Sequence, residues 1–165
     1  MPQSTIVGAF GLKLGDKFDV STASKKVSET KYEFIPETKN DLFTRYYVEV
    51  SPNSKMIYII GAESTVPVEK DSVRMLKKTI GEKYQDFHGT TFYDGLVTSG
   101  MRMVSVHTIN DDVIGVFYSQ MTPKIYLSIK YEDIGDTAWI ASREKRENEN
   151  RRLEESTKNL NLSGI

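Results

Sequence analysis

The chain of 165 residues contains no cysteine, which excludes disulfides, thiolate zinc sites and cysteine nucleophiles. It has two histidines, and neither His88 nor His107 belongs to a spacing that is typical of a metal or catalytic motif. The glycines match neither a dinucleotide-binding fingerprint nor a phosphate-binding loop, and no Gly-x-Ser-x-Gly occurs. We therefore predict no cofactor and no metal ion.

The chain also lacks an excess of one charge and any long hydrophobic run. Its 22 basic and 23 acidic residues give a formal net charge of −1, which offers no general attraction to nucleic acid or anionic lipid. The longest apolar stretch, residues 56–60, is far too short to span a bilayer. We therefore predict neither nucleic-acid binding nor membrane insertion.

No signal peptide is recognisable, because the first ten residues have neither a basic region nor an apolar run of sufficient length. We expect a periplasmic or secreted protein if a presequence was removed, and a cytoplasmic protein otherwise.

Aromatic residues are plentiful, with nine tyrosines, seven phenylalanines and one tryptophan. Disordered chains have few aromatics and a high net charge, so this composition indicates a folded protein with a single core. We predict one domain over residues 1–142, with residues 143–165 as its charged helical extension and tail.

Short alternating strands followed by an amphipathic helix occur twice, over residues 42–84 and 101–157. This order predicts an α+β fold: an antiparallel sheet of about six strands in hairpins and meanders, with two helices on one face. Strands are expected at 42–50, 56–62, 101–109, 113–119 and 125–131. Helices are expected at 69–84, with the apolar stripe Val73, Leu76, Ile80 and Tyr84, and from Gly135 or Asp136 onward.

The last helix differs from the first because residues 143–152 include no apolar side chain. Acidic and basic residues alternate there, and pairs such as Glu147 and Arg151 stabilise a solvated helix. The pattern favours a solvated helix that ends in a tail. The alternative is an arm that docks onto a partner or a second copy of the chain, with anchors at Leu153, Leu160, Leu162 and Ile165.

Helices on one face would leave the other face of the sheet open. The alternation buries Tyr46, Val48 and Val50 in one strand, Val104 and Val106 in another, and Ile125, Leu127 and Ile129 in a third. The open face is then expected to carry Arg45, Tyr47, Met103, His107, Tyr126 and Lys130.

Tyrosine and arginine concentrate binding energy at protein interfaces, so these six residues form the predicted binding site. The alternative is that the aromatics are ordinary strand formers that pair across the sheet.

Two other functions remain open. Asp86 and His88 are two positions apart in Asp-Phe-His, and such a pair could supply a general base to a small hydrolase; His107 is a further candidate for that role. A structural subunit could instead assemble as a homo-oligomer through sheet edges or through the charged helix.

The segment Gly8-Ala-Phe-Gly-Leu-Lys-Leu-Gly15, which alternates like a short strand, and the helix end Leu76-Lys-Lys-Thr-Ile-Gly-Glu-Lys-Tyr84 resemble parts of small exported bacterial α+β domains. Some proteins of that group are inhibitors or immunity proteins, so the resemblance implies export, a bacterial or phage origin, and protein binding. Together with the absent motifs, it predicts a non-catalytic protein-binding module.

Overall fold

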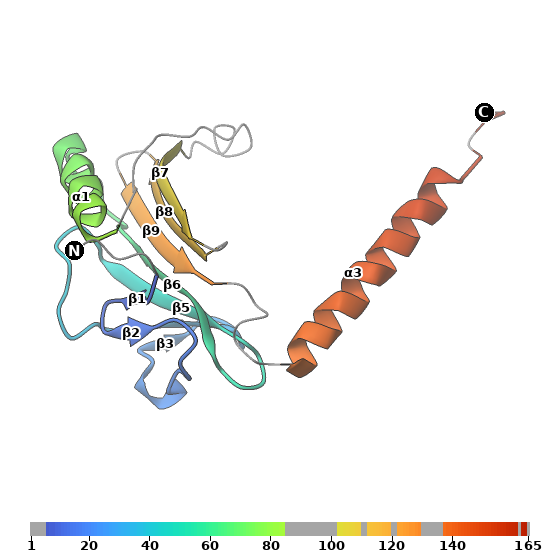
Figure 1. Ribbon diagram of the computed structural model, residues 1–165, viewed down its shortest axis with the longest axis horizontal. Coiled ribbons are helices and arrows are strands. Elements are labelled where there is room, and N and C mark those ends of the chain that lie inside the picture. Colours follow the sequence, from blue (N-terminus) through green and yellow to red (C-terminus); the bar gives the residue numbers. More distant parts are fainter. Residues whose placement is uncertain are drawn as a thin grey trace.

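The computed structural model describes residues 6–84, 102–109, 112–119, 122–129, 137–161 and 163–164, and for residues 70, 102–109, 117–119 and 137–140 it describes the backbone alone. These residues form an α+β structure with a large antiparallel sheet, a small two-stranded sheet and two α-helices (Figure 1). The predicted fold class is confirmed.

The large sheet has the strand order β3-β4-β5-β6-β9-β8-β7, and every pair of neighbours is antiparallel. Six strands have three or more residues, and β3 adds a short edge, which agrees with the expected number. The strands are β3 (Lys25–Lys26), β4 (Lys31–Glu33), β5 (Arg45–Val50), β6 (Ile57–Glu63), β7 (Arg102–Ile109), β8 (Asp112–Ser119) and β9 (Thr122–Ser128).

The predicted repeat of three strands and a helix is present in the described part of the chain. Strands β4, β5 and β6 precede α1 (Lys70–Lys83), and strands β7, β8 and β9 precede α3 (Thr137–Lys158). The two three-stranded units meet at β6 and β9, where Gly61 lies opposite Tyr126. A half-turn about an axis perpendicular to the sheet at this pair exchanges the two units, so the topology has an approximate two-fold axis.

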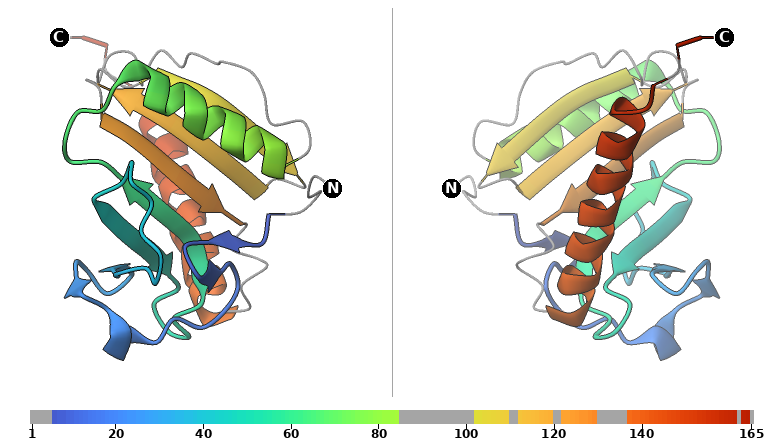
Figure 2. Two further views of the ribbon diagram at one scale, coloured as in Figure 1. Left: turned by 90° about the vertical axis from the view of Figure 1, so that its left-hand side faces the viewer. Right: turned by 90° about the vertical axis from the view of Figure 1, so that its right-hand side faces the viewer.

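Helix α1 covers one face of the sheet and lies over the strands of the second unit (Figure 2). Its predicted apolar stripe is confirmed, because all four side chains are buried. A 3.6-residue period places such a stripe on one side of a helix, which explains why α1 packs along its length. The stripe consists of Val73, Leu76, Ile80 and Tyr84.

The first unit is covered by the N-terminal segment rather than by a helix. The segment forms a hairpin from β1 (Gly8–Ala9) and β2 (Leu12–Lys13). Its two turn residues, Phe10 and Gly11, have φ values of 55° and 84°, as a tight two-residue hairpin requires. The expected single strand over residues 8–15 is therefore wrong, because the chain reverses at Phe10.

Aromatic rings attach this segment to the first unit. The Phe10 ring lies edge-on to Tyr46, with centroids 5.0 Å apart, and the Phe18 ring lies 5.7 Å from that of Tyr32. The covered face thus has two separate covers, α1 over one unit and the N-terminal hairpin over the other.

Helix α3 does not cover the face that α1 covers, contrary to the expectation that both helices lie on one face. The two helices lie on opposite sides of the sheet (Figure 1), and the side chains described in α3 are exposed except for the half-buried Arg143. The reason is composition: residues 143–152 offer no apolar side chain that could be buried.

Candidate binding face

The open face is the side of the sheet opposite α1. Residues that lie opposite each other in an antiparallel pair are on the same face, so the register defines rows across the strands. One row runs through four adjacent strands as Tyr47, Gly61, Tyr126 and Gly115. We call it the tyrosine–glycine row, and it crosses the junction between the two three-stranded units.

Tyr47 lies on this open face and is nevertheless only 4% exposed. Its ring lies against Gly61, where a β-carbon would be 2.1 Å from Cζ of the tyrosine. The ammonium groups of Lys31 and Lys124 lie 4.4 Å and 5.4 Å from the ring centroid. The glycine therefore lets the ring approach the sheet, and two cations interact with its π-system.

The hydroxyl of Tyr47 is hard to ionise. Burial raises its pKa, and the charges of Glu49 and Glu63 raise it further, with a smaller contribution from Tyr126. An anion at this position would lose water and lie near other negative charges. Tyr47 is therefore a neutral hydrogen-bonding group throughout the physiological pH range.

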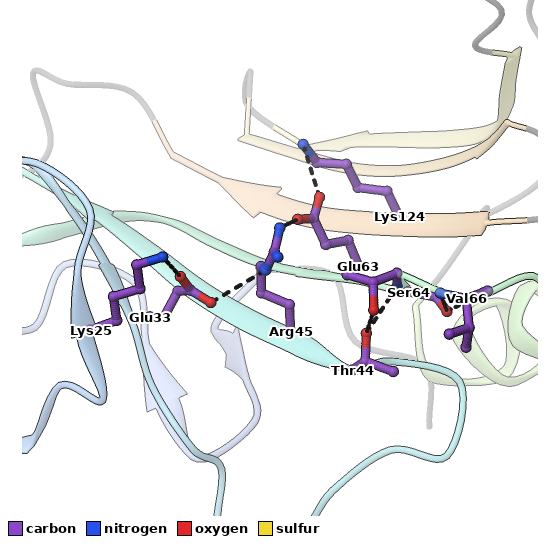
Figure 3. Close-up of polar contacts among 9 residues, drawn as sticks. Lys25, Glu33, Thr44, Arg45, Glu63, Ser64, Val66 and Lys124 are labelled. Atoms are coloured by element: carbon purple, nitrogen blue, oxygen red, sulfur yellow. Dashed lines mark hydrogen bonds and ion pairs between the residues drawn. The ribbon is translucent and has the colours of Figure 1, made fainter.

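A ladder of charges runs beside the tyrosine–glycine row, with one residue from each of five adjacent strands (Figure 3). Lys25 Nζ lies 3.9 Å from a carboxylate oxygen of Glu33. Arg45 bridges two carboxylates: Nε is 3.3 Å from Glu33, and Nη1 is 2.8 Å from Glu63. Lys124 Nζ lies 3.9 Å from the other oxygen of Glu63.

The charge ladder alternates in sign and holds its side chains in a defined arrangement. Exposed ion pairs contribute little to stability, typically about 0–1 kcal/mol each, so the ladder is not what holds the sheet together. Its physical effect is to present three cations and two carboxylates in fixed order across the face.

Polar contacts also fix the chain where β6 ends. The hydroxyls of Thr44 and Thr65 lie 2.8 Å apart, and the buried Ser64 hydroxyl donates to the carbonyl of Val66 (Figure 3). These bonds hold the segment after Glu63 against the start of β5, next to the middle of the charge ladder.

Three of the six predicted site residues are brought together on the open face. Arg45 belongs to the charge ladder, and Tyr47 and Tyr126 belong to the tyrosine–glycine row. Lys130 lies outside the described residues.

The remaining two residues are in β7, whose backbone alone is described. Met103 lies opposite Phe117, in register with Lys124 of the open face. The pairing is irregular between Met103 and Ser105, and the extra residue of a bulge reverses the alternation beyond it. His107 is therefore opposite the buried Ile114, on the covered face, and the expectation that it lies on the open face is wrong.

The same irregularity reverses the expectation for Val106. Its partner in the register is Gly115, which belongs to the tyrosine–glycine row. Val106 is therefore placed on the open face, although the simple alternation of β7 predicts it in the core.

Most of the residues that surround Tyr47 could not be predicted from the sequence. Lys31, Glu33, Glu63 and Lys124 reach this face from strands that only the sheet order makes neighbours. One signal was present: Gly61 interrupts an otherwise strong strand, and such a glycine often marks a close approach of another group.

The alternative catalytic residues Asp86 and His88 lie outside the described residues, and the hydrolase stays a prediction. In the part of the chain that the structure describes, no three acidic or histidine side chains are grouped so that they could hold a metal ion. No helix within the described ranges is long and apolar enough to cross a membrane.

The fold and this face define an α+β protein whose antiparallel sheet is covered on one side and carries an ordered polar and aromatic surface on the other. Comparison of the chain with protein-family models, with curated proteins and with solved structures finds no match. The resemblance to small exported bacterial domains stays a prediction from sequence, and the function has to be inferred from the geometry of the face.

Proposed function

We propose that the protein is a non-catalytic protein-binding module that binds its partner through the open face of the sheet. The observation that carries the proposal is the tyrosine–glycine row. Tyr126 lies between Gly61 and Gly115 in the register, and it is half-buried, so part of it stays accessible to a partner. Tyrosines bury much area at low entropic cost when a partner docks.

The position of the row supports this role. It lies on the four central strands β5, β6, β9 and β8, whose backbone is paired on both sides and is therefore rigid. A preorganised surface loses little entropy on binding. The charge ladder beside it favours a partner with a complementary order of charges, which fixes orientation and specificity more than affinity.

A narrower form of the proposal is an inhibitor or immunity-type protein that acts in the periplasm or outside the cell. It rests on the resemblance of residues 8–15 and 76–84 to small exported bacterial domains. Its test is whether a partner, once identified, loses its own activity when the two proteins form a one-to-one complex.

The first test is site-specific photocrosslinking in cells of the source organism. A benzophenone amino acid replaces Tyr126 on the open face or, as a matched control, the exposed Lys78 on the outer side of α1. We expect one protein to be crosslinked from position 126 and not from position 78. The crosslink from position 126 to this protein should be lost when the chain also carries Arg45→Ala. Equal yields from both positions would contradict binding through the open face.

A further inference from the structure

The two covers of the covered face leave a pocket of about 200 Å³ where they meet. One wall is α1, the second is the N-terminal hairpin, and the floor is formed by β8 and β9. Most of the lining is apolar and includes Phe10, Phe43, Leu76, Ile80, Ile125 and Leu127.

The hairpin that forms one wall is itself closely packed. Its backbone is closely packed at Gly8, where a β-carbon would lie 2.0 Å from the carbonyl oxygen of Leu12. Phe10 is held in the left-handed region and packs edge-on against Phe43 and Tyr46. The pocket is therefore a consequence of how two independent segments cover one sheet.

Four lining residues carry polar side-chain groups, namely Asn40, Thr79, Lys83 and Tyr84, and the Thr79 hydroxyl already donates to the carbonyl of Met75. Asn40 accepts a hydrogen bond from the backbone N–H of Leu42 at its Oδ1, 2.9 Å away, so the group that it can offer a ligand is its NH₂. Lys83, also in the lining, is exposed in the last turn of α1, with its ammonium 5.5 Å from the centroid of the Tyr84 ring. An ammonium and an amide NH₂ together favour an anionic acceptor.

We propose that this pocket binds a small amphipathic carboxylate, with its apolar body between the hairpin and α1 and its carboxylate at Lys83 and Asn40. An apolar cavity of about 150 Å³ holds a benzene molecule, so the pocket fits a single ring or a chain of about six to eight carbons. The inference is independent of protein binding, because the pocket lies on the opposite side of the sheet from the tyrosine–glycine row.

The binding is tested with octanoate and the full chain, labelled at the isoleucine δ-methyl groups for NMR. We expect saturable shifts of Ile80, Ile114 and Ile125, which line the pocket, and none of Ile59 on the open face. Shortening the chain to hexanoate should weaken binding by about fourfold per methylene removed, as apolar transfer requires. Shifts that do not saturate, or that are as large at Ile59, would overturn the proposal.

The head-group assignment is tested with a matched pair of lysines on α1. Lys83→Gln should weaken the binding of octanoate at least fivefold and leave the binding of octan-1-ol unchanged. Lys78→Gln, at an exposed position outside the lining, should change the affinity for neither compound. Equal losses in both variants would show general attraction of the anion and refute the carboxylate site.

A variant that fills the pocket gives an independent test. Ala9 lines it from the hairpin, and Ala9→Leu should abolish octanoate binding while the methyl spectrum remains that of a folded protein. Undiminished binding by this folded variant would overturn the proposal. If the Ala9→Leu variant does not fold, the comparison of octanoate binding by Lys83→Gln and Lys78→Gln still tests the proposal.

Discussion

The two faces of the sheet show how the same strands serve two purposes. On the covered face, Val48, Ile60, Ile114 and Val116 are almost completely buried under α1 and the hairpin. On the open face the central positions are tyrosines, glycines and charged residues, with fewer apolar side chains such as Ile59. Apolar burial dominates folding free energy, so the covered face determines whether the chain folds, and the open face is free to vary in chemistry.

The largest effect is expected from two neighbouring isoleucines of β6. Ile60 is fully buried on the covered face, whereas Ile59 is half-exposed on the open face. Ile60→Ala should lower the free energy of unfolding by about 2–5 kcal/mol, and Ile59→Ala by about 1 kcal/mol or less. Urea denaturation measures both, and similar losses would mean that the two faces do not differ as described.

A second prediction concerns Gly61, where the open face is tightly packed. Gly61→Ala puts a β-carbon against the Tyr47 ring, and such overpacking typically costs about 1–3 kcal/mol. Adding Tyr47→Ala should remove part of this loss, because the clash disappears. A double-mutant cycle by chemical denaturation tests this, and strictly additive losses would show that the ring does not lie over Gly61.

The third prediction is a loss of stability at alkaline pH. The pKa of Tyr47 is raised in the folded protein, so above the usual tyrosine pKa of about 10 the unfolded chain releases a proton that the folded chain retains. The contribution of Tyr47 to the free energy of unfolding is therefore complete below this pH and is lost progressively above it. The slope is at most about 1.4 kcal/mol per pH unit for one group.

Denaturation at a series of pH values above 10 measures this slope, with Tyr47→Phe as the comparison. Burial also raises the pKa of Tyr84 on the covered face, so the stability of the Tyr47→Phe variant should still decrease somewhat with rising pH. An unchanged slope in this variant would assign the whole effect to other groups.

The smallest effect is expected in the charge ladder. Arg45 bridges Glu33 and Glu63 with a side chain that is nearly half exposed, so Arg45→Ala should cost about 0–1 kcal/mol, and less at high salt. Thermal unfolding at low and high salt measures the difference. A loss of several kcal/mol would mean that the ladder supports the fold as well as the surface.

The sequence was sufficient to predict features that depend on neighbours along the chain. The stripe of α1 and the strands β5 and β6 follow from local periodicity, and all are present. The charged composition of α3 likewise indicated a helix that cannot pack into a core, although the prediction of two helices on one face did not use that information.

The remaining features depend on pairings that no local pattern reveals. Strand β6 pairs on one side with β5 and on the other with β9, which is distant in sequence, so neither the tyrosine–glycine row nor the charge ladder could be assembled from the chain alone. The irregularity at Met103 reverses the face of His107. Phe10 in the left-handed region has no sequence signal either, since such a φ is unusual for an aromatic residue.

The junction of β6 and β9 has a kinetic consequence. Each three-stranded unit is built largely from strands adjacent in sequence, whereas the junction closes a long loop, and such closure slows folding. We expect mutations at the junction to slow refolding in stopped-flow measurements more than mutations at β4–β5 that cost the same stability. The tyrosine–glycine row crosses this junction, so a chain with both units formed and the junction open would have two half-surfaces and no complete binding face.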